Sequence, residues 1–205
     1  MNRNWIIYTL SAIVLAGAIA VMFGWFLDIA ILKSLLPSAV TMKFITSVCF
    51  LFSAILVFLL AKKEKNEWIN FSILIISFTL FLLMITFFIS LFVGISTGIE
   101  SLFVKEVVGA VKTSVPGVPA VPTMICFIFI GLVGLFFVYD PKSNKGNFWL
   151  GIITSIIGGL ALAGYILNIP QLYYTFKGFT SMSLITSFLF VLIGISLMLI
   201  RGEEK

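Results

Sequence analysis

The chain has 205 residues, of which 61% are hydrophobic and 10% are charged, and its formal net charge is +5. One soluble core of this size cannot bury so much apolar side chain, so the composition excludes a soluble globular domain and predicts an integral membrane protein. The positive charges flank apolar segments and form no basic cluster, which excludes a nucleic-acid partner and leaves membrane lipids as the expected surroundings.

Six apolar runs follow one another, and each is long enough to cross a hydrocarbon layer of roughly 30 Å as a helix. We expect these helices at residues 5–27, 43–61, 68–95, 123–139, 148–167 and 183–200. The first run also resembles a signal peptide, since Arg3 precedes it and Ala18-Ile-Ala20 resembles a cleavage sequence. We favour a membrane helix, because apolar sequence continues to Leu27 and matches the starts of two later segments.

The positions of lysine and arginine predict the orientation of these helices. Eight basic residues lie on the side of the two chain ends and five lie on the other side. Because cytoplasmic loops carry the excess of positive charge, both termini are expected in the cytoplasm of a multi-pass protein of the cell membrane.

A sequence pattern recurs three times at a spacing of 70 residues, beginning at Gly24, Gly94 and Gly164. Each copy is followed downstream by a second motif that begins at Thr46, Thr123 or Thr186. We interpret the chain as one membrane domain of three helical hairpins, covering residues 1–66, 67–141 and 142–205. Each hairpin crosses the membrane twice, so the copies are parallel repeats, and we expect an all-α, six-helix bundle with pseudo-threefold symmetry.

The outer loops of the three hairpins also share a pattern. Asp28, Gly98 and Asn168 occupy equivalent positions, and all three residue types are favoured at helix N-caps. Apolar residues follow at helical spacing, which predicts a short amphipathic helix at the membrane surface in each loop. The second loop is seven residues longer, with the additional residues lying within 104–117.

In the second helix of each hairpin, a phenylalanine follows the motif threonine four residues later, on the same helix face. Two interpretations remain open: this face is a helix-packing seam, or the hydroxyls and rings converge near the axis and line a pocket for a small, largely apolar ligand. Polar residues at the mouth of the bundle would complete such a pocket. The candidate ligand-binding residues are Thr46, Thr123, Thr186, Phe50, Phe127, Phe190, Asp28, Glu100 and Asn168.

Catalytic chemistry has little support in this sequence. The chain has no histidine, no metal-ligand cluster, no glycine-rich phosphate loop and no nucleophile beside a base, so we expect neither an enzyme nor a cofactor or metal. Glu100 also suits the positive end of a short helix. The middles of the six runs carry no ionisable residue, which disfavours proton-coupled transport. Cys49 and Cys126 are expected to be small buried residues rather than a disulfide.

Residues 36–54 resemble the multi-pass N-terminal membrane region of bacterial and archaeal sensor histidine kinases and diguanylate cyclases. In that region a Pro…Met-x-x-x-Thr-x-x-x-Phe-x-x-x-Gly phrase opens a membrane helix after an outer loop. Here Met42, Thr46 and Phe50 match it, and Ala54 replaces the glycine. Residues 101–117 and 179–199 resemble the same regions. The resemblance implies signal input, but the sequence ends at Lys205 without an output domain, so we expect a separate partner.

The leading hypothesis is therefore a non-enzymatic membrane sensor or ligand-binding module that acts through a separate cytoplasmic or membrane signalling partner. One alternative is a channel or carrier for a small neutral solute. Another is a structural subunit of a larger membrane complex. The sequence leaves self-association into a homo-oligomer open.

Overall fold

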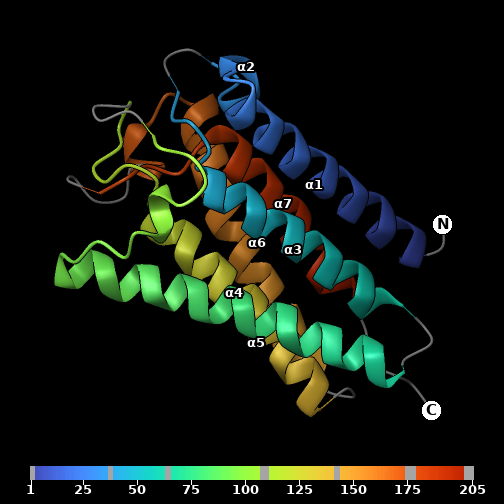
Figure 1. Ribbon diagram of the computed structural model, residues 1–205. Helices are drawn as coiled ribbons and strands as arrows, with labels where there is room; N and C mark the ends of the chain where they lie inside the picture. The colour runs from blue at the N-terminus through green and yellow to red at the C-terminus, as the bar shows by residue number, and fades with distance from the viewer. Residues whose placement is uncertain are drawn as a thin grey trace.

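The computed structural model describes residues 3–36, 39–62, 66–106, 111–140, 144–173 and 179–200 (Figure 1). These residues form an all-helical protein, and no strand occurs among them. The elements in chain order are α1 (Arg3–Phe26), α2 (Ala30–Lys33), α3 (Phe44–Ala61), α4 (Glu67–Val93), η1 (Ile99–Ser101), α5 (Val121–Tyr139), α6 (Asn144–Ile166), η2 (Pro170–Leu172) and α7 (Leu184–Leu199).

Each of the six predicted apolar runs forms a helix. Five of these helices, α1, α3, α4, α5 and α6, are long and apolar enough to cross a membrane. The sixth, α7, is also apolar but has 16 residues. By length and composition, these helices are compatible with the multi-pass membrane protein that the sequence predicts.

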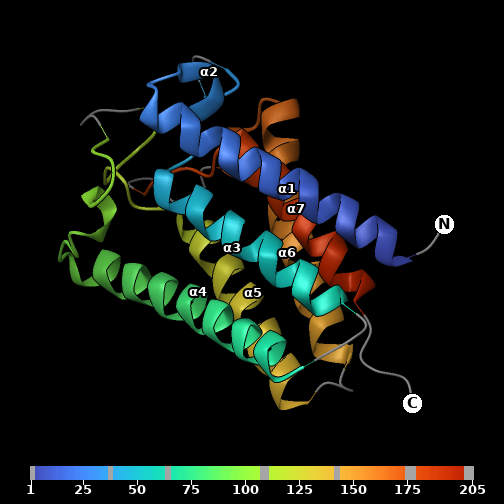
Figure 2. The same ribbon diagram turned by 45° about the vertical axis from the view of Figure 1, so that its right-hand side comes forward.

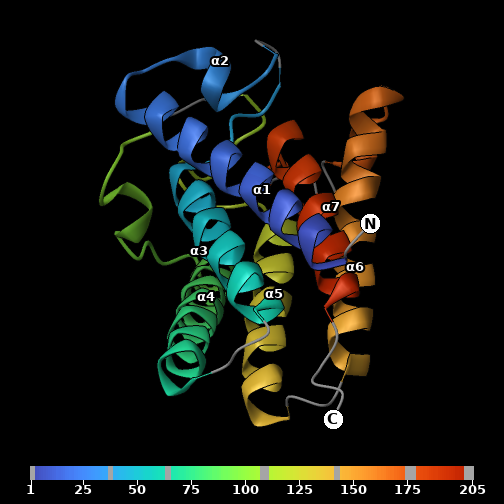
Figure 3. The same cartoon turned by 90° about the vertical axis from the view of Figure 1, so that its right-hand side faces the viewer.

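Consecutive long helices pair as hairpins, and the most extensive contacts join α1 with α3, α4 with α5, and α6 with α7. We call these pairs the first, second and third hairpins. Further contacts of α3 with α4, α5 with α6, and α1 with α7 close the bundle (Figure 2). Figure 3 shows α4 and α6 on opposite sides of α5.

The second helix of each hairpin lies inside the bundle, and the first lies outside. In the most apolar stretches of α3 and α5, 61% and 56% of the residues are buried, compared with 28% in α1, α4 and α6. The helix α3 contacts both α5 and α7. The inner helices therefore form the core, and the outer helices present apolar side chains to the surroundings.

Glycines allow the helices of a hairpin to approach closely. A Cβ atom at Gly151 of α6 would lie 2.8 Å from the carbonyl oxygen of Gly194 on α7. A Cβ atom at Gly131 of α5 would lie 2.9 Å from the carbonyl oxygen of Ser77 on α4. Small residues at such contacts are typical of helices that associate in lipid, where the hydrophobic effect does not drive them together.

Each outer loop contains a short, single-turn helix, but the predicted N-caps are wrong in two of the three. The N-cap positions of α2 and η2 are Ile29 and Ile169, whereas Gly98 does cap η1. Asp28 and Asn168 instead adopt a left-handed conformation with φ of 54°.

The physical reason is that these two residues end the preceding helices. The amide of Ile29 donates to the carbonyl of Gly24 at 2.9 Å, and the amide of Ile169 donates to that of Gly164 at 2.8 Å. This bonding requires a left-handed residue just after the helix, a conformation that asparagine and aspartate tolerate better than most residues.

One predicted hairpin boundary coincides with an observed helix start. Asn66 caps α4, and its side chain accepts a hydrogen bond from the amide of Ile69 at 2.8 Å. The other predicted boundary, between residues 141 and 142, lies outside the described residues. Cys49 and Cys126 are both buried and free.

Candidate functional site

Three phenylalanine rings from the three inner helices meet inside the bundle. The ring centroid of Phe50 on α3 lies 4.9 Å from that of Phe127 on α5 and 4.7 Å from that of Phe190 on α7, and the last two lie 4.9 Å apart. All three side chains are completely buried. Such tilted and edge-on arrangements are favourable for aromatic pairs. This aromatic cluster fills the space between α3, α5 and α7 at its level.

The three motif threonines lie one helical turn before these rings, towards the ends of α3, α5 and α7 that follow the outer loops. Thr46, Thr123 and Thr186 are each only 2% exposed. The hydroxyls of Thr186 and Ser183 are hydrogen-bonded at 2.8 Å, and the Ser183 hydroxyl also accepts from the Thr186 amide at 3.1 Å. The threonines are therefore enclosed by protein, and the one in α7 also takes part in capping its helix.

A buried ion pair lies at the start of α3. The Lys43 ammonium is 2.5 Å from Oε1 of Glu106, and their side chains are only 2% and 5% exposed. Lys43 also donates to the Thr113 hydroxyl at 2.7 Å, and Thr41 donates to Glu106 Oε1 at 3.0 Å. The Gly117 amide donates to Glu106 Oε2 at 2.7 Å. We call these five residues the outer ion-pair cluster.

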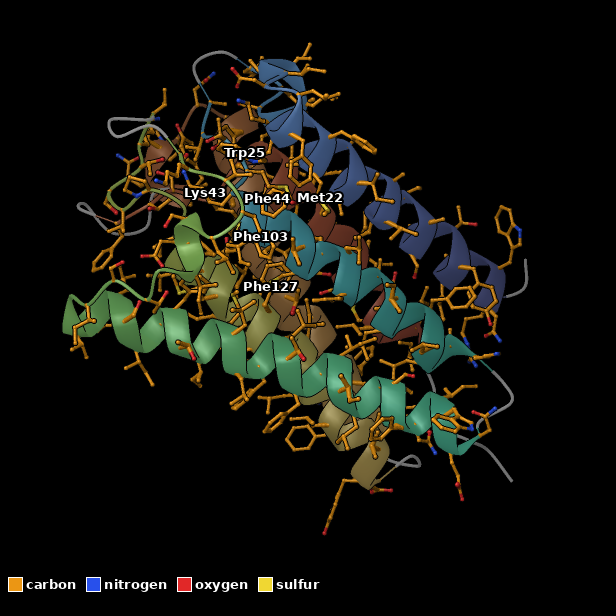
Figure 4. All side chains as sticks on the ribbon, in the orientation of Figure 1. Met22, Trp25, Lys43, Phe44, Phe103 and Phe127 are labelled. Atoms are coloured by element: carbon orange, nitrogen blue, oxygen red, sulfur yellow. The ribbon has the colours of Figure 1, made fainter. Side chains whose placement is uncertain are left out.

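The outer ion-pair cluster joins the first hairpin to the outer loop of the second. Burial lowers the pKa of Lys43 below its ordinary value, although the neighbouring Glu106 carboxylate opposes this shift. Removing each charge from water costs several kcal/mol, and the additional hydrogen bonds offset part of that cost. Figure 4 shows Lys43 near the outer loops and Phe127 deeper in the bundle.

A second polar contact joins the same loop to the third hairpin. The Lys112 ammonium donates to the Tyr173 hydroxyl at 2.7 Å and lies 4.7 Å from the centre of its ring. Tyr173 stacks on Tyr165 with ring centroids 4.0 Å apart. The Ser181 amide donates to the Lys112 carbonyl at 3.1 Å. The long second loop thus connects all three hairpins at the outer end.

Two of the other three predicted site residues, Asp28 and Glu100, have local partners. Asp28 is 92% exposed and pairs with Lys33 at 2.5 Å, and this hydrogen bond lowers its pKa. Burial opposes ionisation of Glu100, but hydrogen bonds from Ser96, Thr97 and backbone amides outweigh it and lower its pKa to about 2. Asn168 lies in an exposed turn. These contacts do not bring the three residues together with the threonines and phenylalanines.

Lys43 and Glu106 were not candidate site residues in the sequence interpretation, although two signals point to them. Lys43 precedes the threonine motif where the other copies have Ala120 and Ser183. Glu106 lies within the lengthened part of the second outer loop. A charge that is unique to one copy and an acidic residue in the inserted segment are natural candidates for pairing.

The described residues form a helical bundle that is compatible with a multi-pass membrane protein, with an aromatic core and a buried polar cluster at the end where the loops after α1 and α4 meet. The chain matches no protein-family model, no curated protein and no solved structure.

Proposed function

We propose that the chain is a non-enzymatic membrane module that binds a ligand at its outer end and passes a change in helix packing to a separate partner protein. The observation that carries this proposal is the arrangement of two buried clusters. The aromatic cluster joins the three inner helices, and the outer ion-pair cluster holds a loop at the start of one of them. A ligand that displaced this loop would act on all three hairpins.

The proposal includes six membrane crossings with pseudo-threefold symmetry. The alternation of outer and inner helices supports it, as do matching contacts in two hairpins. Trp25 donates to the carbonyl of Met42 at 2.8 Å, and Tyr165 at the equivalent position donates to that of Met182 at 2.8 Å. The 16 residues of α7 span about 24 Å, and a bilayer accommodates such a short helix by local thinning.

The distribution of basic residues supports an orientation in which the outer loops lie away from the cytoplasm. The resemblance to sensor kinase and cyclase membrane regions supports a role in signal input. In those proteins the membrane region acts on an output domain, so we propose that a cytoplasmic or membrane partner supplies the output here.

The candidate ligand site lies next to the outer ion-pair cluster. The motif threonines would supply hydrogen bonds, and the aromatic cluster would supply the apolar inner wall. Lys43 stands three residues before Thr46, about one helical turn away. A ligand that reaches this level therefore perturbs the contact between Lys43 and Glu106, which links binding to the position of the loop.

Substitution of the three threonines by valine tests this proposal. Valine preserves the shape of the side chain and removes the hydroxyl. We would measure thermal unfolding midpoints in mild detergent for the wild type and for Thr46→Val/Thr123→Val/Thr186→Val, each with a panel of small, largely apolar compounds that carry one hydrogen-bonding group. We expect some compounds to raise the midpoint of the wild type and to have no effect on the variant.

The matched control is Thr86→Val on the exposed face of α4, where the hydroxyl bonds to the carbonyl of Leu82 at 2.8 Å in its own helix. This control should respond to the compounds as the wild type does. The proposal fails if the triple variant binds as the wild type does. If the triple variant does not fold while the Thr86→Val control does, the threonines form a helix-packing seam rather than a ligand site.

Two other functions make different predictions. A channel or carrier would increase the flux of a neutral solute across liposome membranes. The three rings of the aromatic cluster would have to move apart to let the solute pass. A structural subunit of a larger complex would co-purify in mild detergent with a stoichiometric partner irrespective of ligand.

A further inference from the structure

An apolar groove runs between α1 and α7 on the outside of the bundle, and α2 covers its outer end. The groove has a volume of about 480 Å³, within the range of ligand sites. Its lining residues extend from Ile13 to Val21 on α1, a length of about 12 Å along the helix. Further lining residues are Leu32 and Leu35 near α2 and Ile185 and Phe188 on α7.

A second groove at an equivalent place provides an internal comparison. It lies between α5, α6 and η2 and has a volume of about 270 Å³. Its residues Ile157 and Leu160 stand 140 positions after Gly17 and Ala20 of the first groove. Gly17 and Ala20 have smaller side chains than Ile157 and Leu160, which agrees with the larger volume of the first groove.

We propose that the groove between α1 and α7 binds one acyl chain of a membrane phospholipid. The inference rests on the membrane placement that is part of the proposed function. The groove is open at exposed side chains such as Ile13 and Phe188, on the side that would face hydrocarbon. An unfilled apolar groove there would forfeit dispersion contacts, which a flexible chain can supply.

Two observations favour a lipid chain over the helix of a partner protein. Residues of the α2 segment line the groove at its outer end, so a straight membrane-spanning helix cannot continue through it. Lys33 follows Leu32 at this end, where its ammonium pairs with Asp28 at 2.5 Å, so a phospholipid phosphate bound here would share or replace that carboxylate. A lipid can place its chain below α2 and its headgroup beside it.

Photolabelling of the full chain in vesicles tests this site. The vesicles would contain phosphatidylcholine and phosphatidylglycerol, with a small fraction of phosphatidylcholine that carries a diazirine on one acyl chain. We expect peptides of α1 and α7 around Ala20 and Phe188 to be labelled more strongly than the exposed face of α4 around Phe78. The substitution Ala20→Leu, which copies Leu160, should reduce this excess labelling at least about fourfold, the effect of losing one buried methylene contact.

The control Gly159→Leu adds the same kind of side chain to α6 at a position with no neighbour within 4 Å, and it should leave groove labelling unchanged. The reciprocal variant Leu160→Ala should increase labelling of the second groove. The proposal is overturned if wild-type labelling of the groove equals that of α4, or if Ala20→Leu has no effect. It is also overturned if the groove is not labelled because a second copy of the chain covers it.

The result also distinguishes failure of this site from failure of the proposed function. Labelling of α4 without excess labelling of the groove rejects only the lipid site. Absence of labelling from all outer helices rejects the membrane placement itself. The threonine variants are judged by compound binding, which this experiment does not measure.

Discussion

At the scale of single residues, the contact between Lys43 and Glu106 dominates the outer end of the molecule. Both side chains are almost fully buried, whereas Asp28 of the other described ion pair is almost fully exposed. A buried charge that loses its partner cannot regain its hydration, but an exposed one can. Substitution in the buried pair should therefore lower the free energy of unfolding much more than substitution in the exposed pair.

We expect Glu106→Gln to lower the free energy of unfolding by about 3–5 kcal/mol, because it leaves the Lys43 charge buried without a carboxylate. The double variant Lys43→Met/Glu106→Leu should recover part of this loss, since it removes both charges. Equilibrium unfolding in mixed micelles measures these differences, with Asp28→Asn as the exposed control. A loss no greater for Glu106→Gln than for Asp28→Asn would contradict this interpretation.

At the scale of elements, the sequence was sufficient to locate the long helices but not all of their ends. Apolar runs longer than a membrane span leave few alternatives to a helix, because backbone polar groups in lipid must bond internally. Asp28 and Asn168 were assigned to the wrong helix end, since these residue types favour both N-caps and left-handed turns. Only the hydrogen bonds of the following isoleucine amides distinguish the two.

Two adjacent glycines of α6 test how closely this element packs. A Cβ atom at Gly158 would lie 2.7 Å from the Ser187 carbonyl oxygen and 2.9 Å from Phe190 Cβ, whereas one at Gly159 has no neighbour within 4 Å. We expect Gly158→Ala to destabilise the protein by about 1–3 kcal/mol through overpacking. Gly159→Ala should be neutral or stabilising by up to about 1 kcal/mol, because alanine favours helix.

The same unfolding measurement in mixed micelles applies to both glycine variants. Equal effects of the two substitutions would show that α6 and α7 do not approach each other as closely as the structure has them.

At the scale of the whole molecule, the meeting of Phe50, Phe127 and Phe190 was predictable, because each follows a motif threonine by four residues in a threefold pattern. The outer ion-pair cluster was not predictable in this way. Its charged partners are 63 residues apart in sequence, and one of them lies within residues 104–117, the part of the second loop that contains the additional residues. Repetition predicts what the copies share, whereas contacts of the inserted loop depend on how the hairpins assemble.

We propose, above all, that the inner helices close around the aromatic cluster and that the protein binds a ligand rather than conducting a solute. Stopped-flow light scattering of liposomes tests it most directly, with glycerol and larger neutral solutes applied as osmotic gradients to vesicles with and without the reconstituted chain. We expect equal permeability in both. Saturable flux of any of these solutes through the wild-type chain would contradict the account and establish the carrier function instead.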